Sequence, residues 1–342
     1  MSAPTLTPAG SADTASTPSA DSNLLRRLIS TPEAGVVAAC VLAFISFSIA
    51  AHTYYSTVNL QVMGRDLAQL GILAIGESFV ILTGGIDLSV GGLAGLAGIL
   101  AGWFNVNHGM PGPVAIALTL LICAGVGFWH GTMVNKLNVP PFVITLVTFT
   151  ICKGLSQALT SGTPITGVSN VFGDIELYYV GPVPVPALIF LVVAVAAWFV
   201  LERTYVGRQI YAVGGNAEAA RLAGIPTRRR ITSTYVVSST LAGLVGILIV
   251  GRLGVADASV AGNGAELLAI AAAVVGGVSL FGGEGRIVGI AAGAILLELI
   301  NNGLLAMNVN AYYQTVVQGV VLGIAVLADR IRAQYFGGGA KR

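Results

Sequence analysis

Charged side chains are scarce in this sequence. Lysine, arginine, aspartate and glutamate together make up 9% of its 342 residues, whereas a soluble domain carries about 25%. Hydrophobic residues reach 55%, and apolar runs of about 18 residues or more, long enough to cross a bilayer, recur along the chain. The composition excludes an ordinary soluble domain and predicts a protein that spans a membrane several times.

Residues that carry catalysis or hold metals are equally rare. The three cysteines (Cys40, Cys123 and Cys152) and the three histidines show no metal-ligand spacing, and we expect the cysteines to be buried as small hydrophobic residues. No G-x-x-x-x-G-K-[ST] phosphate loop and no G-x-S-x-G nucleophile turn occurs. We therefore expect no bound cofactor, no metal, no catalytic residue and no nucleic-acid partner.

Glycine, in contrast, is abundant, at 45 of 342 residues, or about twice its average usage of roughly 7%. Several glycines follow the G-x-x-x-G spacing that lets membrane helices approach closely. The pairs are Gly91/Gly95, Gly98/Gly102, Gly127/Gly131, Gly285/Gly289, Gly289/Gly293 and Gly319/Gly323. Together they favour a compact helix bundle.

The apolar runs predict an all-α integral membrane protein with about ten transmembrane helices. They cover residues 34–51, 66–83, 88–104, 113–134, 141–160, 184–201, 231–252, 265–281, 287–306 and 312–329. The second and third runs are separated only by Gly84-Gly85-Ile86-Asp87. This part of the chain is also compatible with a single span, or with a broken helix followed by a half-helix.

The distribution of basic residues predicts the topology. With a cytoplasmic N-terminus, 14 of the 17 lysines and arginines lie inside, Arg65 and Arg252 lie outside, and Lys153 lies within a span. The outer segments 105–112, 161–183 and 253–264 contain no lysine or arginine. This asymmetry follows the positive-inside rule and predicts an even number of spans with both termini in the cytoplasm.

Three regions follow from these patterns. Residues 1–30 are predicted to be a disordered cytoplasmic tail, because the first 23 residues are rich in Ser, Thr, Ala and Pro and lack any basic residue. Residues 31–332 form the transmembrane domain, which includes one long polar loop at 202–230. Residues 333–342 form a short basic tail.

The polar loop contains the signature of a short capped helix. Asn216 suits the N-cap, Glu218 lies in the first turn where the helix dipole favours an anion, and Gly224 suits the position after the last turn. Such a short helix is marginal in isolation, so it should need a partner surface. The alternative is an ordinary cytoplasmic loop that carries positive-inside charges.

The same residues resemble a known family. Glu218-Ala219-Ala220 followed by Gly224 matches the E-A-A-x-x-x-G signature of ABC importer permeases, and four stretches resemble the ribose/xylose/arabinose-type branch. These stretches are 80–91, 139–146, 204–216 and 276–285, and the resemblance covers about residues 66–329.

This resemblance implies a transport subunit of the bacterial inner membrane rather than an enzyme. A separate ATPase, which binds ATP and magnesium itself, would dock on the loop helix and drive alternating access. A periplasmic or lipid-anchored binding protein would deliver a monosaccharide or polyol to the outer loops, and a second permease copy or a close paralogue would complete the pathway. The implied coupling residues are Gly214, Asn216, Glu218, Ala219, Ala220, Arg221 and Gly224. The resemblance leaves open the cargo, be it ribose, xylose, inositol or a furanosyl signalling molecule.

Ionisable and amide side chains at membrane depth are the predicted pathway residues, because such groups are costly in lipid and suit hydroxylated cargo. The set is Glu77, Asp87, Phe142, Lys153, Glu298, Asn301 and Asn302; Phe142 is included as an aromatic face. The alternatives are hydrogen bonds that only hold the bundle together, a capping role for Asp87 and a plain helix start at Phe142. His130 is expected to be structural.

Two other classes of function compete with this interpretation. An ion-coupled secondary transporter would use Glu77, Asp87 and Glu298 for proton or sodium coupling, but it leaves the capped helix without a purpose. The hypothesis of a membrane-embedded enzyme lacks support, because the sequence shows no nucleophile, metal or acid–base constellation.

Overall fold

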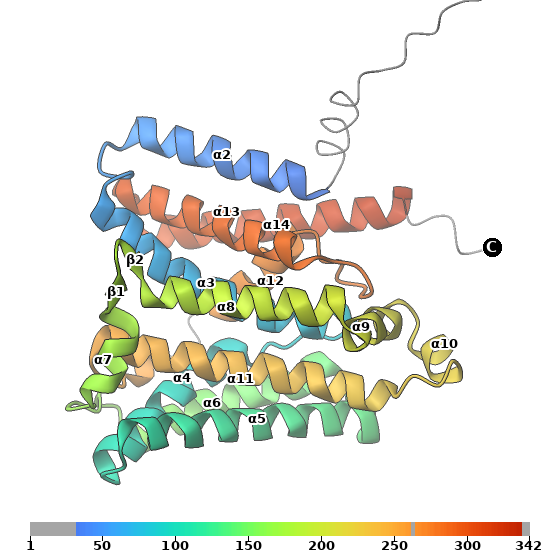
Figure 1. Cartoon of the computed structure of the whole chain (residues 1–342), viewed down its shortest axis with the longest axis horizontal. Helices are drawn as coiled ribbons and strands as arrows, with labels where there is room; N and C mark the ends of the chain where they lie inside the picture. The colour runs from blue at the N-terminus through green and yellow to red at the C-terminus, as the bar shows by residue number, and fades with distance from the viewer. Residues whose placement is uncertain (1–31, 261–263, 337–342) are drawn as a thin grey trace, which may run out of the picture.

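The computed structural model describes residues 32–260 and 264–336, which form a bundle of helices lying side by side (Figure 1). The predicted N-terminal tail, residues 1–30, and residues 337–342 of the predicted C-terminal tail lie outside the described residues, whereas residues 333–336 belong to the last helix. An all-α membrane protein is therefore confirmed.

The helices follow the order expected from the apolar runs. They are α2 (Pro32–Ala50), α3 (Thr57–Leu82), α4 (Val90–Gly102) with the π-helical turn η1 (Trp103–Asn107), α5 (Gly112–Leu137), α6 (Pro141–Thr160), α7 (Asn170–Leu177), α8 (Val185–Trp198) with the π-helical turn η2 (Phe199–Arg203), α9 (Tyr205–Gly215), α10 (Ala217–Leu222), α11 (Thr227–Leu253), the 3-10 turn η3 (Ala258–Val260), α12 (Ala265–Val275), α13 (Ile287–Ala306) and α14 (Ala311–Phe336). The strands β1 (Tyr179–Val180) and β2 (Val183–Pro184) pair antiparallel in one hairpin.

Six stretches of helix in the described chain are long and apolar enough to cross a membrane: α4 with η1, α5, α6, α8 with η2, α11 and α13. The ambiguous region at residues 84–87 is a break between two helices, because α3 ends at Leu82 and α4 begins at Val90. Gly84, at φ +81°, makes the turn that separates them.

The eighth predicted span, 265–281, is longer than the helix found there. Helix α12 has 11 residues and so measures about 16 Å, roughly half of a hydrocarbon core about 30 Å thick. The chain leaves the helix at Gly276 and Gly277, and further glycines with positive φ follow at Gly282, Gly283 and Gly285. These glycines stop the helix although the run remains apolar as far as Phe281.

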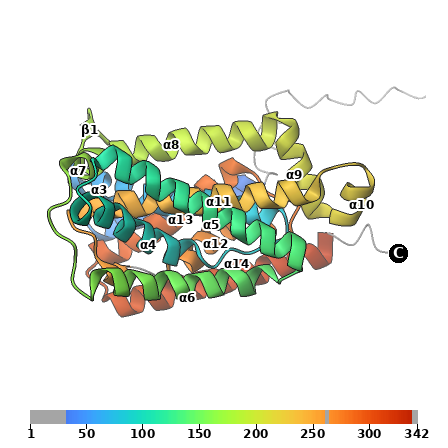
Figure 2. The same cartoon turned by 90° about the horizontal axis from the view of Figure 1, so that it is seen from below.

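Helix α11 lies at the centre of the bundle and packs against α3, α4 and α5 (Figure 2). The predicted glycine pair Gly127/Gly131 lies at the contact between α5 and α11. A Cβ atom on Gly127 would lie 2.4 Å from the Tyr235 carbonyl oxygen, and one on Gly131 would lie 2.5 Å from the Thr232 Cα. The pair Gly319/Gly323 has open space instead, so it forms no close contact within the described chain.

The two ends of the bundle differ. Helices α9 and α10 lie at one end, together with the N-terminal end of α2 and the C-terminal end of α14, while α7 and the β-hairpin lie at the other (Figure 1). At the hairpin end, Ile165 and Ala256 exchange backbone hydrogen bonds of 2.9 and 3.0 Å, which join the two long segments predicted to lie outside.

Two glycines on α5 give a matched test of this packing. Gly127→Val should destabilise the protein by roughly 1–3 kcal/mol, because its side chain would overlap the α11 backbone. Gly125→Val should have little effect, because a Cβ atom there meets nothing within 4 Å. Thermal unfolding of the two purified variants in detergent measures the difference. Equal melting temperatures would contradict the packing described.

Candidate functional site

The predicted loop helix exists as α10, which projects from one end of the bundle (Figure 1). The Asn216 side-chain oxygen accepts a 2.9 Å hydrogen bond from the Ala219 backbone N–H, as an N-cap does. At the other end, Gly224 has φ +82°, and the Ile225 N–H donates to the Ala220 carbonyl at 3.0 Å. This is the bonding that closes a helix through a left-handed glycine.

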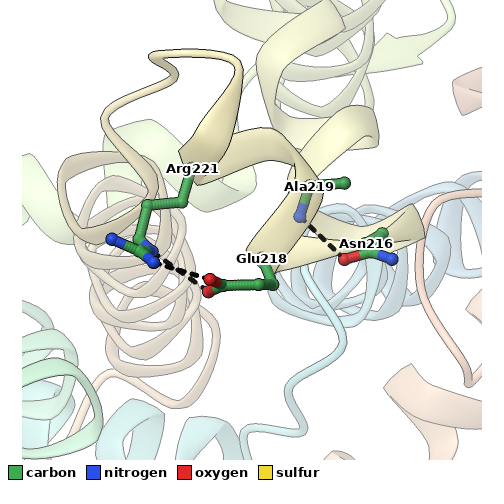
Figure 3. Close-up of polar contacts among 4 residues, drawn as sticks. All are labelled: Asn216, Glu218, Ala219 and Arg221. Carbon is green, nitrogen blue, oxygen red and sulfur yellow. Dashed lines mark hydrogen bonds and ion pairs between the residues drawn. The ribbon is translucent and has the colours of Figure 1, made fainter.

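Glu218 and Arg221 form an ion pair on the surface of α10 (Figure 3). The Arg221 Nε and Nη2 atoms donate to the two carboxylate oxygens of Glu218 at 3.0 and 2.6 Å. These hydrogen bonds and the guanidinium charge hold the pKa of Glu218 below its usual value. Because both side chains are about two-thirds exposed, the pair stabilises the helix little but presents two charges to a partner.

Leu222 is a functional candidate that the sequence analysis missed. It is the last residue of α10, and its side chain is 75% exposed, whereas Ala220 is buried against the protein. A leucine beside an ion pair gives α10 an apolar contact residue as well as charges. The sequence shows an apolar residue at this position, but its exposure depends on how α10 packs and could not be read from the sequence.

Gly214 anchors the projecting helix to the membrane part of the protein. A Cβ atom on Gly214 would lie 1.9 Å from the Leu82 carbonyl oxygen and 2.5 Å from the Gly283 nitrogen. The Gly283 N–H donates to that same Leu82 oxygen at 3.0 Å. The end of α9 therefore rests where the end of α3 meets the loop between α12 and α13, and any larger residue would separate these segments.

Glu77 and Asp87 meet in a sealed polar cluster, in which both residues have no exposed surface. The Asp87 N–H donates to Glu77 Oε1 at 3.0 Å, and the Asp87 carboxylate accepts hydrogen bonds from the Ser89 N–H at 3.0 Å and from Ser238 Oγ at 3.0 Å. Asp87 thus bonds the residue before α4 rather than the first turn of that helix. These bonds tie α3, the entry to α4 and α11 together.

His130 lies near this cluster and is also buried. Its Nε2 atom is 2.7 Å from Thr148 Oγ1, which links α5 to α6. This contact fits the structural role expected for His130.

Phe142 and Lys153 are both exposed on α6, and Lys153 lies within electrostatic range of Glu266 of α12. They are 11 residues apart, which is close to three helical turns, so they share one face. Thr150 and Gln157 are exposed as well and lie near the same line. Helix α6 therefore presents a polar stripe at membrane depth.

The three residues predicted on α13 take different positions. Glu298 and Asn301 line a cavity of about 300 Å³, together with Gln318 of α14. Asn302 instead pairs with Asn59 of α3, through side-chain hydrogen bonds of 2.7 and 3.3 Å. The structure thus brings Glu298, Asn301 and Gln318 together and separates Asn302 from them.

Arg65 and Arg252, the two basic residues predicted to lie outside, have partners in the structure. Arg252 forms an ion pair with Asp66, and Arg65 hydrogen-bonds to the Tyr179 hydroxyl, with its guanidinium 5.0 Å from the ring centre. A charge that is paired or stacked loses less on leaving water than an isolated one. These contacts are compatible with two arginines on the side that the charge rule predicts to be nearly free of basic residues.

Sequence comparison defines the class of protein. The family model described as "Branched-chain amino acid transport system / permease component" matches residues 65–326, so the chain belongs to this family. It is a multi-pass permease of the bacterial inner membrane, a transport subunit rather than an enzyme.

Its relatives narrow this class. The chain is 40% identical to a ribose import permease protein of Bacillus subtilis (strain 168) over 286 residues, 83% of this chain and 88% of the relative. It is 41% identical to that of Escherichia coli (strain K12) over 280 residues, 81% and 87% of the two chains. A D-allose transport system permease protein of the same strain is 35% identical over 291 residues, 85% and 89%. None of the solved structures matches the chain.

Proposed function

We propose that this chain is the membrane subunit of an ATP-driven importer for a monosaccharide or a related polyol. The relatives support this cargo, because they are named for ribose and D-allose and align over more than four-fifths of this chain. The family description names amino acids instead; we favour sugars because the named sugar permeases resemble the whole chain.

The observation that carries the proposal is α10, a capped helix that offers an ion pair and an exposed leucine at one end of the bundle. A separate ATPase, holding ATP and magnesium, docks on these residues from the cytoplasm. A periplasmic or lipid-anchored sugar-binding protein docks at the opposite end, where Ile165 and Ala256 join the outer segments.

Gly214 supplies the mechanical connection for alternating access. When the ATPases close on ATP and move α10, the motion passes through α9 to the end of α3 and the loop after α12, because Gly214 is in backbone contact with both. Helix α3 packs against α11, α12 and α13, so a shift of its end changes the packing of the bundle. An ion-coupled transporter is not favoured, since the relatives are permease subunits and α10 would have no function in it.

Variants of α10 test the docking site. Glu218→Arg reverses a charge, Gly224→Pro cannot adopt the φ of +82°, and Leu222→Asp removes the apolar contact. Each should lower sugar uptake and permease-stimulated ATP hydrolysis at least tenfold while the chain still inserts into the membrane. Leu137→Asp changes another exposed leucine, at the end of α5, and should retain both activities. Unchanged transport in all three α10 variants would remove the coupling assignment.

We also propose ten membrane segments with both termini in the cytoplasm. The ten segments are the six spanning helices together with α2, α3, the half-length α12 and α14. The N-terminal end of α2 and the C-terminal end of α14 lie at the α10 end of the bundle (Figure 1).

A green fluorescent protein fused after Arg342 should fluoresce, whereas alkaline phosphatase fused there should be inactive, because the phosphatase works only outside the cytoplasm. The same two reporters inserted after Gly162, in an outer segment, should give the reverse result. Active phosphatase after Arg342 would overturn the ten-segment topology.

A second permease copy, identical or closely related, is proposed to cover the outer face of α6. Lys153 lies about 18 Å along this helix and is exposed from the protomer. A charge at this depth is costly in lipid, so the face should border protein or a water-filled pathway.

Cross-linking tests this arrangement. In a chain whose three natural cysteines are replaced by alanine, Thr150→Cys should form dimers with a short bis-maleimide in native membranes. Val192→Cys, on the exposed face of α8, should remain monomeric under the same conditions. Equal yields of dimer from the two positions would argue against an interface at α6.

A further inference from the structure

The cavity beside Glu298 is lined by residues of a single chain. Its walls come from α3, α4, α11, α12, α13 and α14, and its volume is about 300 Å³, at the lower end of the range for small-molecule sites, about 300–1,000 Å³. Small residues at Gly91, Ala94 and Ala265 leave this room on the α4 and α12 side. Glu298 is 11 residues into α13 and so about 17 Å along it, which places the cavity at membrane depth.

Glu298 lines this cavity with a carboxyl group. Its side chain is only 4% exposed, yet among the described residues no donor hydrogen-bonds to its carboxyl oxygens. Burying a carboxyl group without a partner costs free energy. A ligand or water in the cavity would supply the missing donor.

Asn301 and Gln318 complete a polar wall next to Glu298. Gln318 Nε2 donates to Asn301 Oδ1 at 3.1 Å. This bond fixes the orientation of both amides and leaves the Asn301 amide N–H groups as donors and the Gln318 carbonyl oxygen as an acceptor. The cavity thus offers acceptors at Glu298 and Gln318 and donors at Asn301, with Asp66 and Gln69 also in its lining, and such a mixture of acceptors and donors suits hydroxyl groups.

The charges around the cavity limit what it can hold. Its described lining contains no lysine, arginine or histidine. Arg252 lies within electrostatic range of Glu298, but it is already paired with Asp66. A carboxylate or phosphate would therefore meet carboxyl and amide oxygens without a free cation. This disfavours amino acids, sugar acids and sugar phosphates, and it favours neutral molecules with several hydroxyl groups.

We propose that this cavity is a cargo subsite within each permease chain, in which Glu298, Asn301 and Gln318 hold a neutral polyhydroxylated molecule during transport. The proposal deepens the proposed import of a monosaccharide or polyol and rests on it. Glu298 is the specificity-determining residue of this subsite, because its open acceptors select hydroxyl donors.

The test uses proteoliposomes that contain the permease, its ATPase and its binding protein, with radiolabelled D-ribose, D-allose and D-xylose as neutral probes and leucine and D-galacturonate as charged ones. Leu304→Trp places bulk in the cavity, and Leu305→Trp places the same bulk on the adjacent exposed position. The first variant should lower uptake of the transported sugar at least tenfold, and the second less than twofold.

Glu298→Leu provides a second test that separates cargo binding from structure. It removes the hydrogen-bonding atoms but keeps an apolar side chain of similar size, so uptake should fall roughly tenfold or more. The melting temperature should not fall, because an unpartnered buried carboxyl group does not stabilise the fold. A lower melting temperature together with normal uptake would show a structural role and overturn the proposal.

The outcomes distinguish the two levels of inference. If the wild type imports leucine or galacturonate but none of the neutral sugars, the proposed function fails and the subsite fails with it. If the wild type imports a neutral sugar while Leu304→Trp and Leu305→Trp behave alike, the proposed function stands and the cavity is not a cargo subsite.

Discussion

The backbone contact of Gly214 with Leu82 and Gly283 is the constraint on which the rest of the structure depends. It requires a residue without a side chain, because a Cβ atom would lie 1.9 Å from the Leu82 oxygen. A second contact supports it, because the Tyr211 hydroxyl on α9 donates to the Gly285 carbonyl at 2.9 Å. With these contacts, a force on α10 reaches the end of α3 and the loop after α12, and α3 also contributes to the wall of the Glu298 cavity.

The membrane imposes a second constraint on polar side chains. Some of them bond other protein groups and hold the helices together, whereas others face a cavity. Polar side chains inside the bundle need partners there, and several have them: Asp87 bonds Ser238, and Asn302 bonds Asn59. These contacts join helices distant in sequence, as a structural role requires. Glu298 differs because its carboxyl group faces a cavity instead of a protein donor. Glu77 and Glu298 are both buried glutamates in long helices. They differ because Glu77 accepts a hydrogen bond from the Asp87 N–H, whereas Glu298 lines a cavity.

The sequence allowed much of the helical architecture and the docking helix to be predicted, because both depend on local chemistry. Apolar length located the membrane helices, and Asn216 with Gly224 bounded α10 through capping rules that act within a few residues. The short length of α12 was missed, because its apolar run continues past the glycines that end the helix. The pairing of Asn302 and the cavity at Glu298 were also beyond reach, because each depends on which helices become neighbours.

Selection of cargo and coupling to ATP are therefore placed in different parts of one helix bundle. Most of the proposed coupling residues lie on α10 or at its caps, and these caps fix the shape of the projecting helix. The cavity is lined by residues from six helices, and its polar lining includes Glu298, Asn301 and Gln318. A substitution in that wall changes the hydrogen bonds offered to cargo without touching Gly214 or the contacts of α10. Cargo preference in this chain should accordingly change independently of its response to the ATPase.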